Sequence, residues 1–281
     1  MNILSLQSRV AYGHVGNSAA VPALQSLGHQ TWPVDTTLLS NHLGYQTHSG
    51  RILPAEEVAA VLEGLAQIDV LAECDALLSG FLGHSAEIAA AAAGRLRAAN
   101  PAALYCLDPV MGERNGGFYV RPAIAETIAT RLLPLADIVT PNAFELDQLA
   151  GARTVSLADV AEAADKLRRL ARPGAIVVAT GIGREDGPAD RVEVLAAAES
   201  GIWLGEVPRL VVPAHGGGDI FAALFLGHYL HRRDLPAALQ RAMDSTHAVF
   251  SASVGRLELA LTATLRELAD PPKAAVVRKI R

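Results

Sequence analysis

A glycine tract that ends in one carboxylate, at the start of a long apolar segment, is the part of the sequence best suited to chemistry. The tract is Gly216, Gly217 and Gly218, and the carboxylate is Asp219. Glycines let the backbone approach an anion closely, and the unpaired N–H groups at a helix N-terminus attract negative charge. We therefore predict an anion hole for a phosphoryl group, with Asp219 beside it as a general base. The alternative is that Asp219 only caps the helix that follows.

Two further carboxylates lie just beyond expected strands, where ligands gather in a parallel sheet. Asp108 follows the strand expected at 104–107, and Glu145 follows the strand expected at 137–139. Both are hard oxygen ligands suited to Mg²⁺, although capping at the strand ends is the alternative for each. Phosphoryl transfer from a nucleotide needs a metal, donors around the moving group and a base on the acceptor hydroxyl. This chain can supply all three.

The charge and composition exclude several classes of function. The formal net charge is −5, from 24 basic and 29 acidic residues, so no basic excess is present for a nucleic-acid backbone or an anionic membrane. Lysine occurs only at Lys166, Lys273 and Lys279, away from any glycine tract, which excludes a Walker-type nucleotide site. His228 and His231 share a helix face without a carboxylate partner, so we predict no zinc site. Small-molecule substrates are the expectation.

The cysteines and the N-terminus indicate a cytoplasmic protein. Cys74 and Cys106 are too far apart for a Cys-x-x-Cys pair and too few for a disulfide scaffold. The chain starts with an apolar run and has no basic leader, and no apolar run approaches the roughly 20 residues of a spanning helix. We therefore expect neither secretion nor insertion into a membrane.

Short β-rich apolar runs alternate with longer segments of helical period, which predicts an α/β fold with a mostly parallel sheet. Strands are expected near 2–6, 30–34, 76–78, 104–107, 137–139, 175–179, 191–195 and 201–204. Helices are expected near 17–27, 55–68, 85–99, 123–132, 157–170, 220–231 and 235–254. The Glu-Ser-Gly turn between the last two strands predicts an antiparallel pair near one edge. We expect one domain over 1–281, with a basic, solvated tail from about residue 271.

Several motifs, taken in order, make the chain resemble the pyridoxal kinases of the ribokinase superfamily. They are Gln7-Ser8, the run from Tyr12 to Ser18, Ser40-Asn41-His42, Leu78-Ser79-Gly80, the run from Asp108 to Gly112, the run from Ala136 to Asn142, and Gly216 to Asp219. The Gly-Asp tract fits any ribokinase-like enzyme. The Gly-His-Val-Gly-Asn and Ser-Asn-His segments point to the vitamin B6 branch.

The resemblance implies a fold, a reaction and partners. The fold is a ribokinase-like three-layer sandwich, in which helices flank a central, mostly parallel sheet. The reaction is ATP-dependent phosphorylation of the 5′-hydroxyl of pyridoxal, with pyridoxine and pyridoxamine as further candidate substrates. The resemblance also implies Mg²⁺, a monovalent cation such as K⁺ in many members, and a homodimer.

The same resemblance implies roles for individual residues. Asp219 would be the catalytic base, and Ser8 and Val15 would contact the pyridine ring. The other residues of the substrate site would be His42, Leu43 and Phe81. The nucleotide and its metal would be held by Asp108, Glu113, Tyr119, Asn142, Glu145 and Thr180, with Asp108 and Glu145 as the metal ligands. Core or turn positions are the alternative for Val15, Tyr119 and Thr180.

This sequence departs from the family pattern at several of these positions. Leu43 stands where a threonine usually follows Ser-Asn-His, and Phe81 stands where a tyrosine usually follows Ser-Gly. Both changes remove a hydroxyl that could hydrogen-bond the substrate. Gly217 replaces the usual Thr or Val of the glycine tract, and Glu113 replaces a shorter aspartate. These departures bear on substrate affinity and preference more than on fold or reaction class.

Two alternative functions remain open at this point. A hydroxymethylpyrimidine kinase of the thiamin pathway belongs to the same superfamily, but that branch usually has cysteine at the position of Asp219 and lacks the Ser-Asn-His segment. A non-catalytic protein that binds vitamin B6 is suggested by the loss of the two hydroxyls. Asp108, Glu145 and Asp219 argue against it, because a binding protein needs neither a base nor metal ligands.

Overall fold

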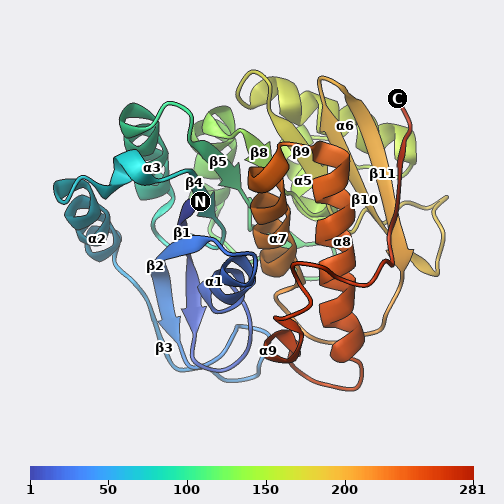
Figure 1. Cartoon of the computed structure of the whole chain (residues 1–281), viewed down its shortest axis with the longest axis horizontal. Helices are drawn as coiled ribbons and strands as arrows, with labels where there is room; N and C mark the ends of the chain where they lie inside the picture. Colours follow the sequence, from blue (N-terminus) through green and yellow to red (C-terminus); the bar gives the residue numbers. More distant parts are fainter.

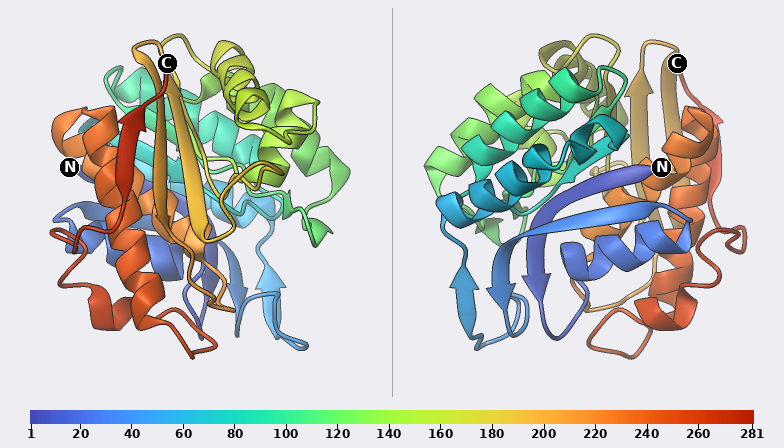
Figure 2. Two further views of the ribbon diagram at one scale, coloured as in Figure 1. Left: turned by 90° about the vertical axis from the view of Figure 1, so that its right-hand side faces the viewer. Right: turned by 60° about the vertical axis from the view of Figure 1, so that its left-hand side comes forward.

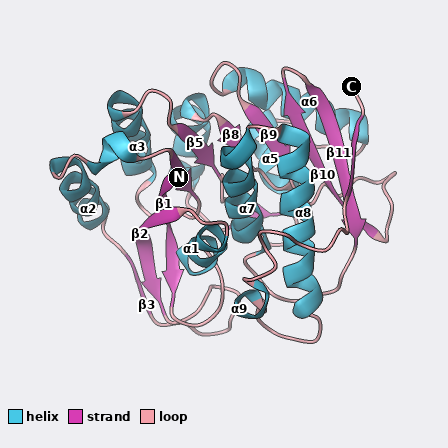
Figure 3. Ribbon diagram, viewed as in Figure 1, coloured by secondary structure: helices cyan, strands magenta, loops and turns pink.

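The computed structural model describes residues 1–281 and is built on one ten-stranded sheet. Its strands run in the order β12-β11-β10-β9-β8-β5-β4-β1-β2-β3, with the site-bearing strands in the middle (Figures 1 and 3). The bounds are β1 Asn2–Val10, β2 Gln30–Leu39, β3 Gly50–Ile52, β4 Ala76–Ser79, β5 Leu104–Leu107, β8 Ile138–Val139, β9 Ile176–Ala179, β10 Arg191–Ala198, β11 Gly201–Pro208 and β12 Val276–Lys279. A separate hairpin joins β6 Gly112–Glu113 and β7 Gly117–Phe118.

The sheet is parallel in its centre and antiparallel at both edges. Neighbouring pairs from β2 through β1, β4, β5 and β8 to β9 are parallel. The edge pairs, β2 with β3 and the series from β9 to β12, are antiparallel. The predicted mostly parallel sheet is therefore confirmed, as is the antiparallel pair on either side of the Glu-Ser-Gly turn. Because the parallel strands all end at the same edge, the residues that follow them are brought together there.

Helices cover both faces of the sheet, which makes three layers (Figure 2). On one face lie α1 Asn17–Ser26, α7 Gly217–Arg232, α8 Leu235–Ala252 and the short α9 Leu261–Thr264; on the other lie α2 Ala55–Gln67, α3 Ala86–Ala99, α4 Pro122–Thr127, α5 Ala143–Ala150 and α6 Leu157–Leu170. The predicted helices are all present, with ends shifted by a few residues. The exception is the segment expected at 123–132, where α4 continues as a π-helical turn at Ile128–Leu132. Helix α5 was not predicted.

Alternating residues of the central strands build two separate apolar cores. Leu4, Leu77 and Tyr105 face the core under α2 to α6, whereas their neighbours Ile3 and Leu78 face the core under α1, α7 and α8. Side chains alternate between the two faces of a strand, so a strand covered on both faces is mostly apolar at successive positions. Strands β4, β5, β8 and β9 follow this rule almost throughout, whereas β1 also buries Ser5 and Gln7, which are hydrogen-bonded to each other.

Helix α7 is apolar on all sides because other elements surround it. It packs between α1 and α8 against the sheet, and its residues from Ile220 to Gly227 are buried. A side chain at Gly227 would lie 2.6 Å from Leu27, so α7 and the end of α1 pack closely at this point. The N-terminus of α7 is thereby held at the edge where the parallel strands end.

No helix of the structure combines the length and the apolar character that crossing a membrane requires.

The C-terminal segment corrects one prediction. We expected a solvated end from about residue 271, but β12 pairs antiparallel with β11 and extends the sheet. Asp244 on α8 is buried and accepts hydrogen bonds from the backbone N–H groups of Ala274 and Ala275, each at 2.7 Å. Lys279 lies over the ring of Trp203, 5.4 Å from its centroid. The sequence signal was weak because β12 is only four residues long and Val276, Arg278 and Lys279 remain exposed.

We predict that Asp244→Ala detaches β12 and lowers the free energy of unfolding by roughly 3 kcal/mol. Hydrogen bonds to a charged group contribute about 1.5–3 kcal/mol each, and the substitution leaves two backbone donors without an acceptor. Urea unfolding measures the stability, and hydrogen exchange of residues 276–279 reports on the strand. Asp270→Ala is the control, because that exposed side chain holds only Arg241 and should change neither measurement appreciably. Unchanged exchange in Asp244→Ala would contradict the assignment.

Candidate active site

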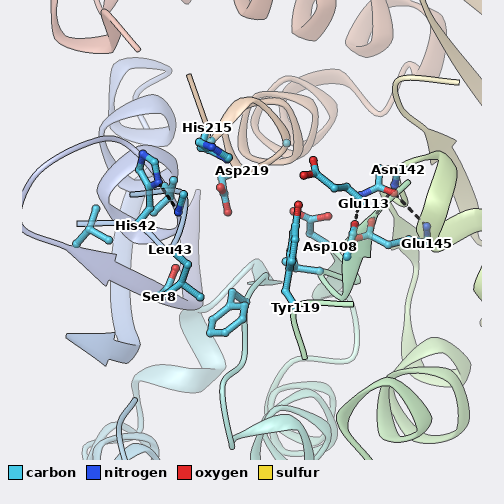
Figure 4. Close-up of a pocket in the computed structure, with 18 of the residues that line it drawn as sticks. Ser8, His42, Leu43, Asp108, Glu113, Tyr119, Asn142, Glu145, His215 and Asp219 are labelled. Atoms are coloured by element: carbon cyan, nitrogen blue, oxygen red, sulfur yellow. Dashed lines mark hydrogen bonds between the residues drawn. The ribbon is translucent and has the colours of Figure 1, made fainter. Parts of the chain in front are cut away.

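A cavity of about 490 Å³ lies at the edge where the parallel strands end (Figure 4). It brings together residues that are far apart in the sequence. All of the predicted site residues line it except Gly217, namely Ser8, Val15, His42, Leu43, Phe81, Asp108, Glu113, Tyr119, Asn142, Glu145, Thr180, Gly216, Gly218 and Asp219. The tertiary arrangement is therefore compatible with one site that has a substrate end and a nucleotide end.

Asp219 projects into this cavity from the first turn of α7 (Figure 4). Loss of hydration raises the pKa of its carboxyl to about 6, while the backbone N–H groups of Gly16 and of Asp219 itself oppose that shift. No side chain donates a hydrogen bond to it. A carboxylate that only capped its helix would not need to face a cavity, so the geometry favours a base over a simple cap.

The three glycines of the tract are required for different reasons. Gly216 has φ +96°, and a side chain there would lie 1.8 Å from the carbonyl oxygen of His14. A side chain at Gly217 would lie 2.6 Å from the ring of Phe250, so this ring occupies the space that the usual Thr or Val would fill. Gly218 has open space at its Cβ position and lines the cavity. The turn is therefore held on two sides and open on the side of Gly218.

Asp108 and Glu145 are both almost fully buried, at 5% and 2% exposure, and line the same cavity. Burial raises the pKa of Glu145 to about 8, against the lowering effect of backbone N–H groups of Asn142, Met111 and Gly112. Burial, and then the negative charges of Glu145 and Asp219, raise the pKa of Asp108 well above its usual range. A cation that binds between these two buried carboxylates would stabilise their ionised form.

Glu145 also has a structural part in the site. It is the third residue of α5 and forms a capping box with Asn142: its Oε2 accepts from the Asn142 N–H at 2.8 Å, and Asn142 Oδ1 accepts from the Glu145 N–H at 3.0 Å. Its Oε1 accepts from the Met111 N–H at 3.0 Å, and Asn142 donates to the carbonyl oxygen of Gly112 at 2.8 Å. The two oxygens together have four lone-pair sites, so the carboxylate keeps capacity for a ligand. Capping and ligand binding are therefore compatible here.

The charged side chains that line the cavity are acidic, with no lysine or arginine among them. Four carboxylates face it, from Asp108, Glu113, Glu145 and Asp219. A nucleotide phosphate brought here would meet negative charge, which would be strongly unfavourable unless a cation came with it. No three His, Cys, Asp or Glu side chains gather at metal-binding spacing. The donor set thus fits Mg²⁺, which is held by one or two carboxylates together with phosphates and water.

The β6–β7 hairpin carries Glu113 and Tyr119 to the mouth of the cavity. Both side chains are exposed, and Tyr119 is joined to the hairpin by a hydrogen bond from its N–H to the Met111 carbonyl, 2.8 Å. Next to Glu113, Arg114 points away from the cavity and pairs with Asp147 at 2.9 Å. The arginine thereby anchors the hairpin to α5.

The opposite end of the cavity is mainly apolar and aromatic. Ser8 lies at a register shift of β1, close to Gly16, where a side chain would lie 2.3 Å from the Ser8 hydroxyl oxygen. Val15 and Phe81 add apolar surface. Leu43 is 52% exposed and makes no hydrogen bond, as expected from the loss of the usual threonine hydroxyl. This end suits a flat, uncharged ring.

A second, smaller cavity of about 270 Å³ adjoins the first, because Thr180 and Gly218 line both. Its wall is mostly apolar and includes Val192, Phe221 and Phe250, as well as Gly217. Gly217, the one predicted site residue outside the main cavity, is therefore found here. Thr180 and Gly218 thus form a wall common to the two cavities.

Sequence reasoning missed several residues of the site. His215 lines the main cavity, and its position directly before the glycine tract was a signal that could have identified it. Thr140 also lines the cavity; the sequence placed it in the 136–142 motif at the end of an expected strand, without a role of its own. Tyr45 and Glu258 lie behind His42 and hydrogen-bond to each other at 2.6 Å. Nothing local in the sequence pairs these two residues.

Comparisons with known proteins agree with this geometry. The model of the phosphomethylpyrimidine kinase family matches residues 16–259. Pyridoxal kinase PdxY of Rubrobacter xylanophilus is 45% identical, with 100% of this chain and 98% of the relative covered. PdxY of Deinococcus radiodurans is 42% identical, with 96% and 93% covered.

Solved structures give the same result. Pyridoxal kinase from Leishmania donovani in complex with ADP and pyridoxamine superposes with a TM-score of 0.92 at 30% identity, covering 100% of this chain and 99% of that one. A putative phosphomethylpyrimidine kinase from Bacteroides thetaiotaomicron, in a crystal form with pyridoxal, superposes with a TM-score of 0.89 at 25% identity, covering 99% of each. These neighbours confirm the predicted ribokinase-like sandwich. The chain therefore belongs to the phosphomethylpyrimidine kinase family and, within it, to the pyridoxal kinases.

Proposed function

We propose that this chain transfers the γ-phosphoryl group of ATP to the 5′-hydroxyl of pyridoxal. The full-length likeness to pyridoxal kinases supports the reaction, and one observation in this structure carries it. Asp219, a carboxylate without a side-chain partner, lies at the glycine-rich start of a helix, between an apolar end and an acidic end of one cavity. That is where a base must lie if an alcohol and a phosphoryl donor meet.

The two ends of the cavity would take the two substrates. The pyridine ring of the vitamer would lie among Ser8, Val15 and Phe81, with its 5′-hydroxyl directed at Asp219. The phosphates of ATP would lie along Gly216 to Gly218 toward Asn142 and Thr180, under the hairpin with Glu113 and Tyr119. The base and sugar of ATP would extend past Gly218 and Thr180, which line both cavities, toward the second, apolar cavity.

The chemistry would be a direct, in-line transfer. The 5′-oxygen forms a bond to the γ-phosphorus, the bond between that phosphorus and the β–γ bridging oxygen breaks, and ADP leaves. Asp219 accepts the hydroxyl proton, and a pKa of about 6 keeps it ionised at neutral pH while making it a stronger base than an ordinary aspartate. Backbone N–H groups of the glycine turn stabilise the charge on the moving phosphoryl group.

Asp108 and Glu145 would hold Mg²⁺ together with the phosphates. The ion would neutralise phosphate charge in a cavity that offers no lysine or arginine. A monovalent cation such as K⁺ would relieve further repulsion, because four carboxylates face the same space. The residues present fit both ions by charge and by the hardness of their oxygen donors.

We also propose a homodimer and a cytoplasmic location. Edge strand β3 leaves backbone groups unpaired, and Ile52 on it and Leu38 on the neighbouring β2 are exposed. A sheet edge with exposed apolar side chains offers a surface on which a second copy of the chain could pair. The cytoplasmic location follows from the need for ATP and from two free, buried cysteines, Cys74 and Cys106, which suit a reducing compartment.

We predict that the wild-type protein converts pyridoxal to its 5′-phosphate with ATP and Mg²⁺, and that Asp219→Asn lowers kcat by about 100-fold or more. Loss of a general base typically costs between 10² and 10⁴ in rate. A coupled assay for ADP release, run with pyridoxal, pyridoxine, pyridoxamine and hydroxymethylpyrimidine, measures turnover and preference.

Calorimetry with ATP and Mg²⁺ is the control for Asp219→Asn, because the variant should bind nucleotide about as well as wild type. Binding of pyridoxal without turnover in the wild type would favour a non-catalytic binding protein. Turnover of hydroxymethylpyrimidine alone would assign the chain to the thiamin branch. Either result would overturn the proposal.

We predict that kcat/KM falls about tenfold per pH unit below pH 6, because Asp219 must be ionised to accept the proton. The effect on stability has the opposite sign. The folded-state pKa of about 6 lies above the ordinary value of 3.8, so folding favours the protonated form, and stability is lost as pH rises from about 4 to 6. Asp219→Asn should therefore be inactive yet more stable than wild type to urea at pH 8. A less stable variant at that pH would contradict the assigned environment.

We predict different outcomes for two neighbouring substitutions in the glycine turn. Gly216→Ala should lower both stability and activity, because its Cβ would meet the His14 carbonyl at 1.8 Å and its φ is +96°. Gly218→Ala should unfold near the wild-type temperature, since nothing lies within 4 Å of its Cβ, but should raise KM for ATP by narrowing the cavity. Thermal unfolding and steady-state kinetics separate the two effects. If Gly218→Ala and the wild type have the same KM for ATP, the phosphates of ATP do not lie beside Gly218, and the proposed position is wrong.

A further inference from the structure

Glu258 is a mostly but not fully buried glutamate that the proposed reaction does not use. It lies in the segment between α8 and α9, and its side chain is 13% exposed. Oε1 accepts a hydrogen bond from the Tyr45 hydroxyl at 2.6 Å and lies 3.1 Å from His42 Nε2. No lysine or arginine pairs with it. A buried carboxylate that lacks a basic partner is costly, so its two hydrogen bonds must matter to the arrangement around it.

The hydrogen bonds of His42 define its tautomer. The Gly44 N–H donates to His42 Nδ1 at 3.1 Å, so Nδ1 carries no proton. The proton of the neutral ring is then on Nε2, which donates to Glu258. Burial lowers the pKa of His42 and outweighs the raising effect of Glu258, which agrees with a neutral ring. Both nitrogens are thus occupied within the protein, and His42 offers the cavity only the surface of its ring.

The ring of His42 connects Glu258 to residues that line the cavity. It packs on Tyr45, with centroids 4.7 Å apart, and on His215, with centroids 4.6 Å apart. His215 is followed directly by Gly216 of the anion-hole turn. On its other side Glu258 contacts the turn that leads to Val15, since a side chain at Gly13 would lie 2.6 Å from Oε2. Glu258 therefore contacts two segments at the vitamer end of the cavity, the 40–45 loop through His42 and Tyr45 and the turn at Gly13. Figure 4 shows His42 and His215 side by side at this end.

We propose that Glu258 is a positioning residue for the vitamer, which fixes the tautomer and orientation of His42 and holds the 40–45 loop against the glycine turn. The proposal rests on the proposed function for the identity of the ligand. It assigns no direct contact between Glu258 and substrate. It also gives His42 a role that differs from the one its motif suggests: the ring forms a shaped wall and donates no hydrogen bond to the vitamer.

The test compares Glu258→Ala with Glu258→Gln, whose amide oxygen can still accept from Tyr45 and His42. Glu258→Ala should raise KM for pyridoxal by about tenfold, the effect of one lost charge-assisted hydrogen bond, while KM for ATP stays within about twofold of wild type. Glu258→Gln should restore most of the affinity. Glu267→Ala is the matched control, because that glutamate lies in the same C-terminal region, is exposed and has no side-chain partner.

A spectroscopic measurement makes the result independent of turnover. Long-range ¹H–¹⁵N NMR of the histidine rings should find His42 with its proton on Nε2 in wild type and Glu258→Gln, and a mixture of tautomers in Glu258→Ala. Calorimetry with pyridoxal gives the affinity even if the wild type fails to turn over, so failure of the proposed function would be recognised separately. Equal changes in KM for both substrates, or a proton on Nδ1 in the wild type, would overturn the proposal.

Discussion

The site depends on negative charge that the protein itself does not neutralise. Asp108, Glu145 and Asp219 face one cavity that neither lysine nor arginine lines, and the pKa of each is raised by loss of hydration. Such an arrangement opposes folding and can persist only because two large apolar cores on either side of the sheet stabilise the chain. It also prepares the site for a cation and its phosphates, so the unfavourable electrostatics of the free protein are an expected feature of a kinase that lacks basic phosphate ligands.

Helix α7 links the cores to this chemistry. Its apolar residues are enclosed by the sheet, α1 and α8, so the position of its first turn cannot vary independently of the core. That turn presents Asp219 and the glycine N–H groups to the cavity. The base and the donors for the phosphoryl group lie on the same rigid helix N-terminus. Their positions relative to each other are therefore fixed by that helix.

The vitamer end is built differently from the nucleotide end. Leu43 and Phe81 lack the hydroxyls usual in the family, and the two nitrogens of His42 are occupied within the protein. This end therefore offers shape and aromatic surface, with the Ser8 hydroxyl as its polar contribution. Gly217 is a similar case. It lacks the side chain usual at this position, and the ring of Phe250 fills that space instead. Shape is then maintained by contacts between distant segments, among which the Glu258 carboxylate is central.

The sequence by itself determined the α/β class, the order of the central strands and helices along the chain, and the identity of Asp108, Glu145 and Asp219 as site candidates. Apolar periodicity, glycines and carboxylates at strand ends are local signals. They can be recognised in the sequence without knowing how distant segments pack. Only the tertiary structure decided that β12 joins the sheet and that Glu258 reaches His42 across 216 residues. Such contacts join segments that are distant in the chain, and the free energy that selects them comes from burial and hydrogen bonding in the folded state, which no local pattern records.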